Sequence, residues 1–143
     1  MAKRIFVLCG NPVSGSLCEE FARSYAAGAS QGGHECRCSF VGQLRFDPNL
    51  RYGYHQRLEL EPDLLAAQES MRWAQHLVFI YPTWWGSLPA LMKGFIDRTF
   101  LPEFAFRYRP GSVFWDKLLK GRSARLIVTM DAPWWWDTIV NGA

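Results

Sequence analysis

The chain alternates short apolar runs with segments of helical periodicity, and this alternation limits its fold more than any other feature. Continuous apolar runs occupy residues 4–9 ("RIFVLC"), 76–82 ("HLVFIYP") and 124–130 ("ARLIVTM"), and residues 34–41 ("HECRCSFV") alternate in polarity. Runs of this length indicate strands, and continuous apolar character is typical of strands that are buried on both faces of a parallel sheet. The sequence therefore predicts four strands.

Helical periodicity fills the intervals between these runs. Apolar residues recur at helical spacing from Leu17 to about Ser30, before the Gly32–Gly33 pair, and again over 61–74 and 89–100. The order strand–helix–strand–helix–strand–helix–strand predicts right-handed βαβ units, and so an α/β fold with a parallel sheet and helices on both faces. We expect the segments 42–60 and 101–122 to be irregular, and the neighbours Asp97 and Arg98 to form a surface charge pair of little energetic weight.

Length and composition narrow the class of protein. The 143 residues favour one domain over 1–143, and 49% hydrophobic with 20% charged residues is ordinary for a globular chain. The net charge of +3 is spread without a dense Lys/Arg run, so we expect no nucleic-acid partner. No apolar run is long enough for a membrane span or a signal peptide, and Cys36–Cys38 lacks the second ligand pair of a zinc site, so we expect a cytoplasmic protein with reduced cysteines and no metal.

The first strand leads into a Gly/Ser/Pro loop, "GNPVSGS" at 10–16, which comes close to the P-loop spacing but lacks its lysine. A loop that runs from a strand into a helix presents free backbone N–H groups at the positive end of the helix dipole, which is an anion site without any lysine. Gly10 and Gly15 allow a tight curl. We expect a single phosphate or a pyrophosphate here; the alternative is a plain helix N-cap at Ser16.

The third strand is followed by "PTWWG" at 82–86, which places two tryptophans directly after a buried strand. Adjacent indoles at a strand end indicate a wall against a planar heteroaromatic ring, whereas the alternative is a hydrophobic lid or an oligomer interface. The carboxyl ends of parallel strands share one edge of the sheet, so the phosphate loop and this aromatic loop should lie together. Together they predict a site for a phosphorylated aromatic cofactor.

Four segments resemble one known family, the NAD(P)H:quinone oxidoreductases of the flavodoxin-like fold: "LCGNPVSGSL", "FIYPTWWGSLPALMKGFIDRTF", "EFAFRY" and "LLKGRSARLIVTMDAP". The resemblance implies a doubly wound parallel sheet with strand order 2-1-3-4, in which the family's fifth strand–helix unit is missing or truncated. It also implies FMN or FAD as cofactor, NAD(P)H as co-substrate, a quinone-like acceptor and a homodimer. The reaction would be a two-electron hydride transfer through the flavin, which needs no catalytic side chain and no metal.

The resemblance also assigns cofactor-binding residues, one group in each strand-end loop. The flavin phosphate side would be held by Asn11, Ser16, Leu17 and Cys18, the ring edge by Pro82, Thr83, Trp84, Trp85 and Gly86, and the far side of the ring by Thr129, Met130 and Asp131. The Trp134–Trp136 cluster would cover the ring or contact the second protomer. The family's Tyr/His pair near the ring has no counterpart, because no histidine follows His76.

Two other functions use the same cofactor site. One is a flavodoxin-type electron carrier, which the basic charge disfavours, and the other is a quinone-reductase-like regulatory subunit of a potassium-efflux system. The long segment 42–60, with Phe46, Tyr52 and Tyr54, is a candidate contributor to the partner protomer's site. The three histidines are scattered along the sequence and are not expected to be catalytic.

Overall fold

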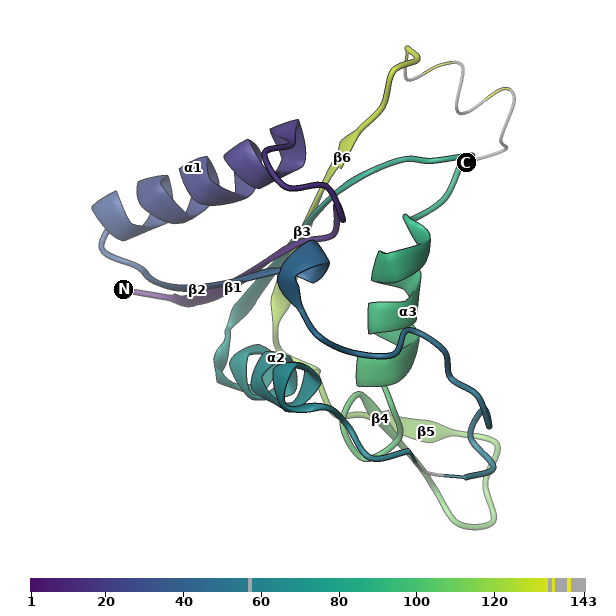
Figure 1. Cartoon of the computed structure of the whole chain (residues 1–143). Coiled ribbons are helices and arrows are strands. Elements are labelled where there is room, and N and C mark those ends of the chain that lie inside the picture. The colour runs from purple at the N-terminus through teal and green to yellow at the C-terminus, as the bar shows by residue number, and fades with distance from the viewer. Residues whose placement is uncertain (57, 134, 136–138, 140–143) are drawn as a thin grey trace.

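Four strands form one parallel sheet in the computed structural model, which describes residues 1–56 and 58–133 together with Trp135 and Ile139 (Figure 1). In spatial order they are β2 (Glu35–Phe40), β1 (Arg4–Cys9), β3 (His76–Pro82) and β6 (Ser123–Thr129). All three pairings are parallel. The expected order 2-1-3-4 is confirmed, with β6 as the fourth strand along the chain.

Helices cover both faces of this sheet, as the alternation predicts. The helix α1 (Leu17–Gln31) packs on one face, and α2 (Pro62–Trp73) and α3 (Ala90–Thr99) pack on the other (Figure 1). A short 3₁₀ turn, η1 (Val41–Gln43), follows β2. The sequence therefore folds as the doubly wound α/β sheet that its pattern indicates.

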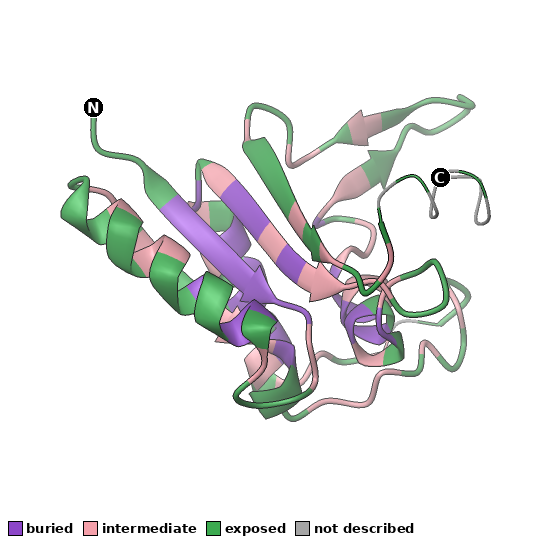
Figure 2. Ribbon diagram, turned by 90° about the horizontal axis from the view of Figure 1, so that it is seen from above, coloured by how far each residue is buried: buried purple, intermediate pink, exposed green. Residues whose placement is uncertain are grey.

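The central strand β1 explains why its sequence is continuously apolar. Its residues alternate between two cores: Ile5 and Val7 pack toward α1, and Phe6 and Leu8 pack toward α2 and α3. Figure 2 shows nearly the whole strand as buried. A strand with helices on both sides has no polar face, so no alternation is visible in its sequence.

The strand β6 is much less buried than its apolar sequence predicts. Among the described residues it pairs with β3 alone, and of its side chains Ile127 packs into the α1 core while Leu126 is 62% exposed. Val128, on the same face as Leu126, is also exposed. The expectation of a fourth buried strand is wrong for this position, because burial depends on neighbours that the strand's own sequence does not encode.

The segment 101–122 is not entirely irregular. It contains an antiparallel pair of three-residue strands, β4 (Phe106–Tyr108) and β5 (Trp115–Lys117), which form a separate two-stranded sheet. The rings of Phe106 and Tyr108 lie 5.2 Å apart in an edge-to-face arrangement. Strands of three residues are too short for an alternating pattern to reveal them.

Arg98 corrects the expectation of a surface pair with Asp97. Its side chain is only 2% exposed, and its Nη2 donates to the Glu61 Oε2 at 2.9 Å. The guanidinium also donates to the backbone carbonyls of Asp47 and Glu59. Asp97 pairs instead with Lys93, one helical turn away. Adjacent helix residues point in different directions, so sequence neighbours do not form such a pair.

The same contacts order the first part of the segment 42–60. The Asp47 N–H donates to Glu61 Oε1 at 3.0 Å, and Phe46 packs edge-to-face on Phe95 at 6.2 Å. Burial alone would raise the pKa of Glu61, but hydrogen bonds from the Asp47 and Glu61 backbone and from Arg98 outweigh it, so the pKa lies below its ordinary value. Phe46 therefore packs, partly buried, against the core of this chain.

No helix in the described ranges is long and apolar enough to cross a membrane. All four cysteines are free thiols, with Cys9 and Cys18 buried. Within the same ranges, no three His, Cys, Asp or Glu side chains are grouped so that they could hold a metal ion.

Candidate functional site

Three loops meet at the carboxyl edge of the sheet. The Thr83 N–H donates to the Thr129 carbonyl at 2.8 Å, and the Cys18 Sγ and Thr129 Oγ1 lie 3.3 Å apart. The Gly10 N–H donates to the carbonyl of Ile80 in β3 at 2.7 Å. The structure thus brings together Cys18, Thr83 and Thr129, one residue from each of the three groups assigned by resemblance.

The first loop ends in a capping box at the start of α1. The Ser16 Oγ accepts from the Glu19 N–H at 3.4 Å, and the Glu19 carboxylate reaches back to the Gly15 N–H at 2.8 Å. Gly15 has a φ of +71°, a conformation that glycine adopts without strain. The N-cap at Ser16 is therefore present, and it coexists with an open helix N-terminus. The Ser-x-x-Glu spacing is the sequence signal that predicts a capping role for Glu19 at the start of this helix.

The carboxylate of Glu19 is held between the loop and Arg23. Its Oε1 accepts from Arg23 Nη2 at 2.6 Å, and its Oε2 also accepts from the Ser14 hydroxyl. The hydrogen bond from Arg23 is the main reason that the pKa of Glu19 lies below its ordinary value, with the Gly15 N–H adding to it. The negative charge is therefore paired with a cation on the side of α1.

We expect Glu19→Gln to lower the thermal unfolding midpoint at neutral pH. Glutamine can still accept from Gly15, so the loss isolates the ion pair with Arg23. Because the folded-state pKa of Glu19 is lowered, its contribution is present above its ordinary value of 4.5 and is lost as the pH falls through the lowered pKa. Circular dichroism melts should show the difference from wild type shrinking as the pH falls below 4.5.

The exposed neighbour Glu20 gives a matched control, because Glu20→Gln removes the same charge from the same helical turn. Its melting midpoint should stay close to that of wild type. A Glu19→Gln difference that is constant over the whole pH range would contradict a role for the ionised carboxylate.

Two backbone donors remain open at the start of α1. Within the described ranges, the N–H groups of Leu17 and Cys18 have no hydrogen-bond partner, and they lie at the positive end of the helix dipole. The Cys18 side chain is buried against Thr129, so only its backbone faces the loop. The Asn11 Oδ1 accepts from the Val13 N–H at 3.0 Å and shapes the turn. These residues fit a phosphate group without a lysine.

Two close approaches fix the position of this loop. A Cβ at Gly10 would lie 2.1 Å from the Met92 Sδ in α3, and a Cβ at Gly42 would lie 2.2 Å from the Pro12 carbonyl oxygen. The close approach of η1 to the loop therefore requires glycine at position 42, whereas a side chain at position 10 would displace the Met92 side chain of α3.

The second loop is a two-residue turn that holds its indoles outward. Trp84 and Ser87 exchange backbone hydrogen bonds at 3.0 and 3.1 Å, and Trp85 and Gly86 between them have φ values of +52° and +68°. Positive φ at both central residues is the type I′ geometry. For a tryptophan it costs about 1–2 kcal/mol. Trp85 is 100% exposed and Trp84 is 44% exposed, so the turn presents a bare aromatic surface beside Thr83.

The third loop is exposed where the structure describes it. Met130 and Asp131 follow the contact residue Thr129 and both face solvent. Trp135 is 47% exposed. Trp134 and Trp136, the other members of the expected tryptophan cluster, lie outside the described residues.

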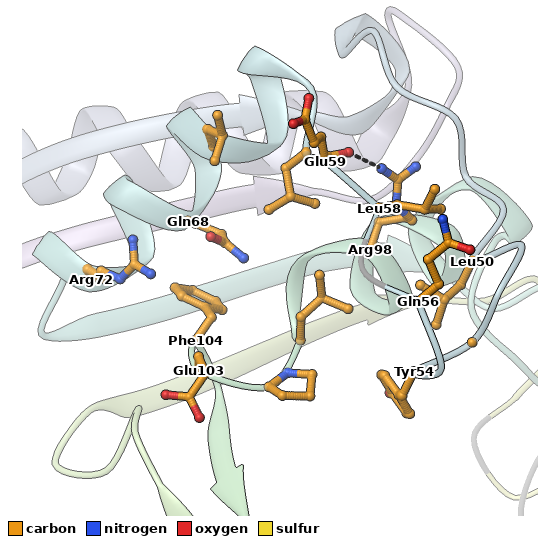
Figure 3. A pocket seen from close by; sticks show the side chains of 15 residues that line it. Leu50, Tyr54, Gln56, Leu58, Glu59, Gln68, Arg72, Arg98, Glu103 and Phe104 are labelled. Atoms are coloured by element: carbon orange, nitrogen blue, oxygen red, sulfur yellow. Dashed lines mark hydrogen bonds between the residues drawn. The ribbon is translucent and has the colours of Figure 1, made fainter.

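A larger hollow lies elsewhere in the described structure. It has a volume of about 860 Å³ and lies between α2, the end of α3 and the segments 50–60 and 101–104 (Figure 3). Arg98 and Gln68 contribute its polar wall, and Figure 3 shows Arg98 bonded to Glu59. Since α3 runs ten residues from the loop edge to this hollow, the two regions are separated by about 15 Å of helix.

Comparison with known proteins agrees with the observed fold. A family model described as the flavodoxin-like fold matches residues 3–138, and the chain belongs to this family. The human protein named ribosyldihydronicotinamide dehydrogenase [quinone] is 40% identical over 92 residues, which is 62% of this chain and 38% of the human protein. The chain spans less than half the length of the curated relatives it matches.

Two solved structures share the fold over nearly the whole chain. A protein of Streptococcus mutans has a TM-score of 0.79 at 29% identity and covers 95% of this chain and 72% of its own. An NAD(P)H:quinone oxidoreductase from Methanothermobacter marburgensis has a TM-score of 0.82 at 22% identity, with 99% and 73% coverage, and at that identity it shows the fold alone.

Proposed function

We propose that this chain is a flavin-dependent NAD(P)H:quinone oxidoreductase, or the flavin-binding part of one. The observation that carries the proposal is the meeting of three strand-end loops, in which open N–H groups at the start of α1 lie on the same edge as the exposed indoles of Trp84 and Trp85. The name of the human relative supports the same reaction class. When bound, the flavin supplies the hydride chemistry.

The residues of the chain would bind and orient the flavin. The N–H groups of Leu17 and Cys18 would hold the phosphate, while Ser16 and Asn11 keep the loop in shape. The type I′ turn fixes the direction of the indoles before any ligand binds, which reduces the cost of ordering them. The backbone N–H groups of Trp85 and Gly86, which donate to no other described residue, would stabilise negative charge on the ring.

On the third strand end, Thr129, Met130 and Asp131 would border the far side of the ring. Thr129 is already fixed by Thr83 and Cys18, whereas Met130 and Asp131 are exposed and free to contact a ligand. We further propose a single flavin-binding domain over 1–143, a cytoplasmic homodimer, and FMN or FAD as the flavin.

The decisive experiment is visible absorption spectroscopy of the purified chain with added FMN or FAD, before and after anaerobic NADH or NADPH. We expect protein-bound flavin bands that bleach on reduction and return when a quinone is added. Bound flavin that neither nucleotide reduces would favour an electron carrier or a regulatory protein. Absence of flavin binding would overturn the proposed site.

We expect Trp84→Ala to weaken flavin binding about tenfold, because stacking of an aromatic side chain on a base-like ring contributes about 1–3 kcal/mol. Trp84→Phe keeps an aromatic face and should retain most of the affinity. Fluorescence titration with FMN measures both variants. Equal affinities for the alanine and phenylalanine variants would show that Trp84 does not contact the ring.

A further inference from the structure

A second, smaller hollow lies at the amino edge of the sheet, on the face that α1 covers. It has a volume of about 510 Å³ and is opposite to the edge that carries the three loops. Figure 1 shows the N-terminus beside the C-terminal end of α1 in this region. The hollow is lined by side chains from five different parts of the chain: Lys3, Tyr25, His34, His76, Ser123 and Arg125.

Positive charge in this hollow is not compensated by acidic residues. Lys3 and Arg125 both line it, and neither forms an ion pair with a carboxylate in the described part of the chain. The lining residues include no aspartate or glutamate. Arg125 lies 5.8 Å from the centre of the Tyr25 ring, and its guanidinium donates no hydrogen bond to any of the described residues.

A hydrogen-bonded row of side chains forms the floor of the hollow. His76 Nδ1 lies 2.8 Å from the Ser123 Oγ, and His76 Nε2 lies 3.3 Å from the Tyr25 hydroxyl. His34 Nδ1 accepts from the Lys3 backbone N–H at 3.2 Å, so its proton, when the ring is neutral, is on Nε2. Sequence positions far apart are thus held in one place, and His34 and His76 line the same hollow, whereas His55 does not.

The electrostatics of His76 agree with an excess of positive charge. Burial is the main cause that lowers the pKa of His76, and the nearby charges of Arg125 and Lys3 lower it further. No carboxylate acts on it in the opposite direction. The groups that face His76 are therefore two cations and the hydroxyls of Tyr25 and Ser123.

The negative end of the α1 dipole does not prevent anion binding here. The last carbonyls of the helix are already engaged, because the N–H groups of Gly32, Gly33 and His34 donate to the carbonyls of Gly28, Ser30 and Ala29. Gly28 and Ala29 of the last turn also line the hollow, but the carbonyls of both are among those already engaged, and Tyr25 lies further back in α1.

We propose that this hollow binds a phosphate-type tetrahedral oxyanion, held by Arg125 and Lys3 with His76 and its hydroxyl partners as further donors. The site is independent of flavin binding, and it lies at the opposite edge of the sheet. A bound dianion favours the charged form of His76, so binding takes up a proton when the pH is near the pKa of this side chain. Affinity therefore rises as the pH falls below the ordinary histidine range.

Sulfate is the sharpest probe, because it keeps its charge over the whole pH range in which histidine titrates. We would titrate the full chain, without flavin, with sodium sulfate against sodium chloride at equal ionic strength, and follow the histidine ring signals by NMR. Wild type should show saturable shifts of His76 that are stronger at about pH 6 than at about pH 8. Arg125→Gln should weaken binding about tenfold, as expected for the loss of a charge-assisted hydrogen bond.

Arg107→Gln is the matched control, because it removes the same charge from an exposed arginine in β4 that does not line the hollow. Its sulfate affinity should equal that of wild type. No saturable response in wild type, or equal losses in both variants, would overturn the site. Parallel titrations with inorganic phosphate and adenosine monophosphate identify the source of the anion: tighter binding of the nucleotide assigns a phosphate monoester, and equal or weaker binding assigns the free ion.

Discussion

Arg98→Ala should lower the free energy of unfolding by about 3 kcal/mol or more, because removing one partner of a buried ion pair leaves the other charge without compensation. Glu61 would lose its cation, and the carbonyls of Asp47 and Glu59 would lose their donor. The Nε of Arg98 is buried without a hydrogen-bond partner, so the native contact is already imperfect. Urea denaturation followed by circular dichroism measures the loss.

The control for this variant is Arg107→Ala. Arg107 pairs with Glu103 at 2.7 Å, but both side chains are more than half exposed, and pairs of this kind contribute between about 0 and 1 kcal/mol. The two variants should therefore differ by several-fold in their effect on unfolding. Similar effects would show that Arg98 contributes no more than a surface ion pair.

Gly94→Ala is expected to lower the free energy of unfolding by about 1–3 kcal/mol, the range of an overpacked core. A Cβ at Gly94 would lie 2.4 Å from the Pro48 Cβ and 2.7 Å from the Pro48 carbonyl oxygen, so α3 and the segment 42–60 would have to separate. Most of these neighbours are backbone atoms or a proline ring, which cannot rotate away.

The same substitution in α1 should have the opposite sign. A Cβ at Gly28 meets nothing within 4 Å, so Gly28→Ala should raise the free energy of unfolding by about 1 kcal/mol, the ordinary difference in helix propensity. Paired urea melts of the two variants isolate the contact with Pro48. Stabilisation by both substitutions would mean that the segment 42–60 is not held against α3.

Most of the fold can be predicted from the sequence because the sheet is parallel. The strands β1 and β3 are covered on both faces, so each is visible in the sequence as a continuous apolar run. The alternation of these runs with helices then predicts the topology. The loops of the candidate site follow directly, since each comes after one of these runs. The contact of Thr83 with Thr129 is a consequence of parallel strand order.

What the sequence does not show depends on contacts between distant residues. Nothing near Arg98 indicates that it is buried, since its partners lie 37 to 51 positions away. The exposure of Leu126 depends on which elements cover β6, and its own run is as apolar as that of a buried strand. His34 and His76 line the same hollow because the C-terminal end of α1 and the first residue of β3 both lie at the amino edge of the sheet.

Arg98 donates to the carbonyls of both Asp47 and Glu59, so one side chain fixes the two ends of a long loop. The described part of the tip between them makes turn hydrogen bonds and a ring contact of Tyr54 with Phe106. Chain length at such a tip has little thermodynamic consequence, because doubling a flexible loop costs only about 0.6 kcal/mol. Insertions and deletions should therefore be tolerated in residues 50–58, in evolution or in engineering. The same changes next to Asp47 would break the hydrogen bonds from Arg98. The hollow beside this tip could then change in size and lining without any change in the sheet that carries the three loops.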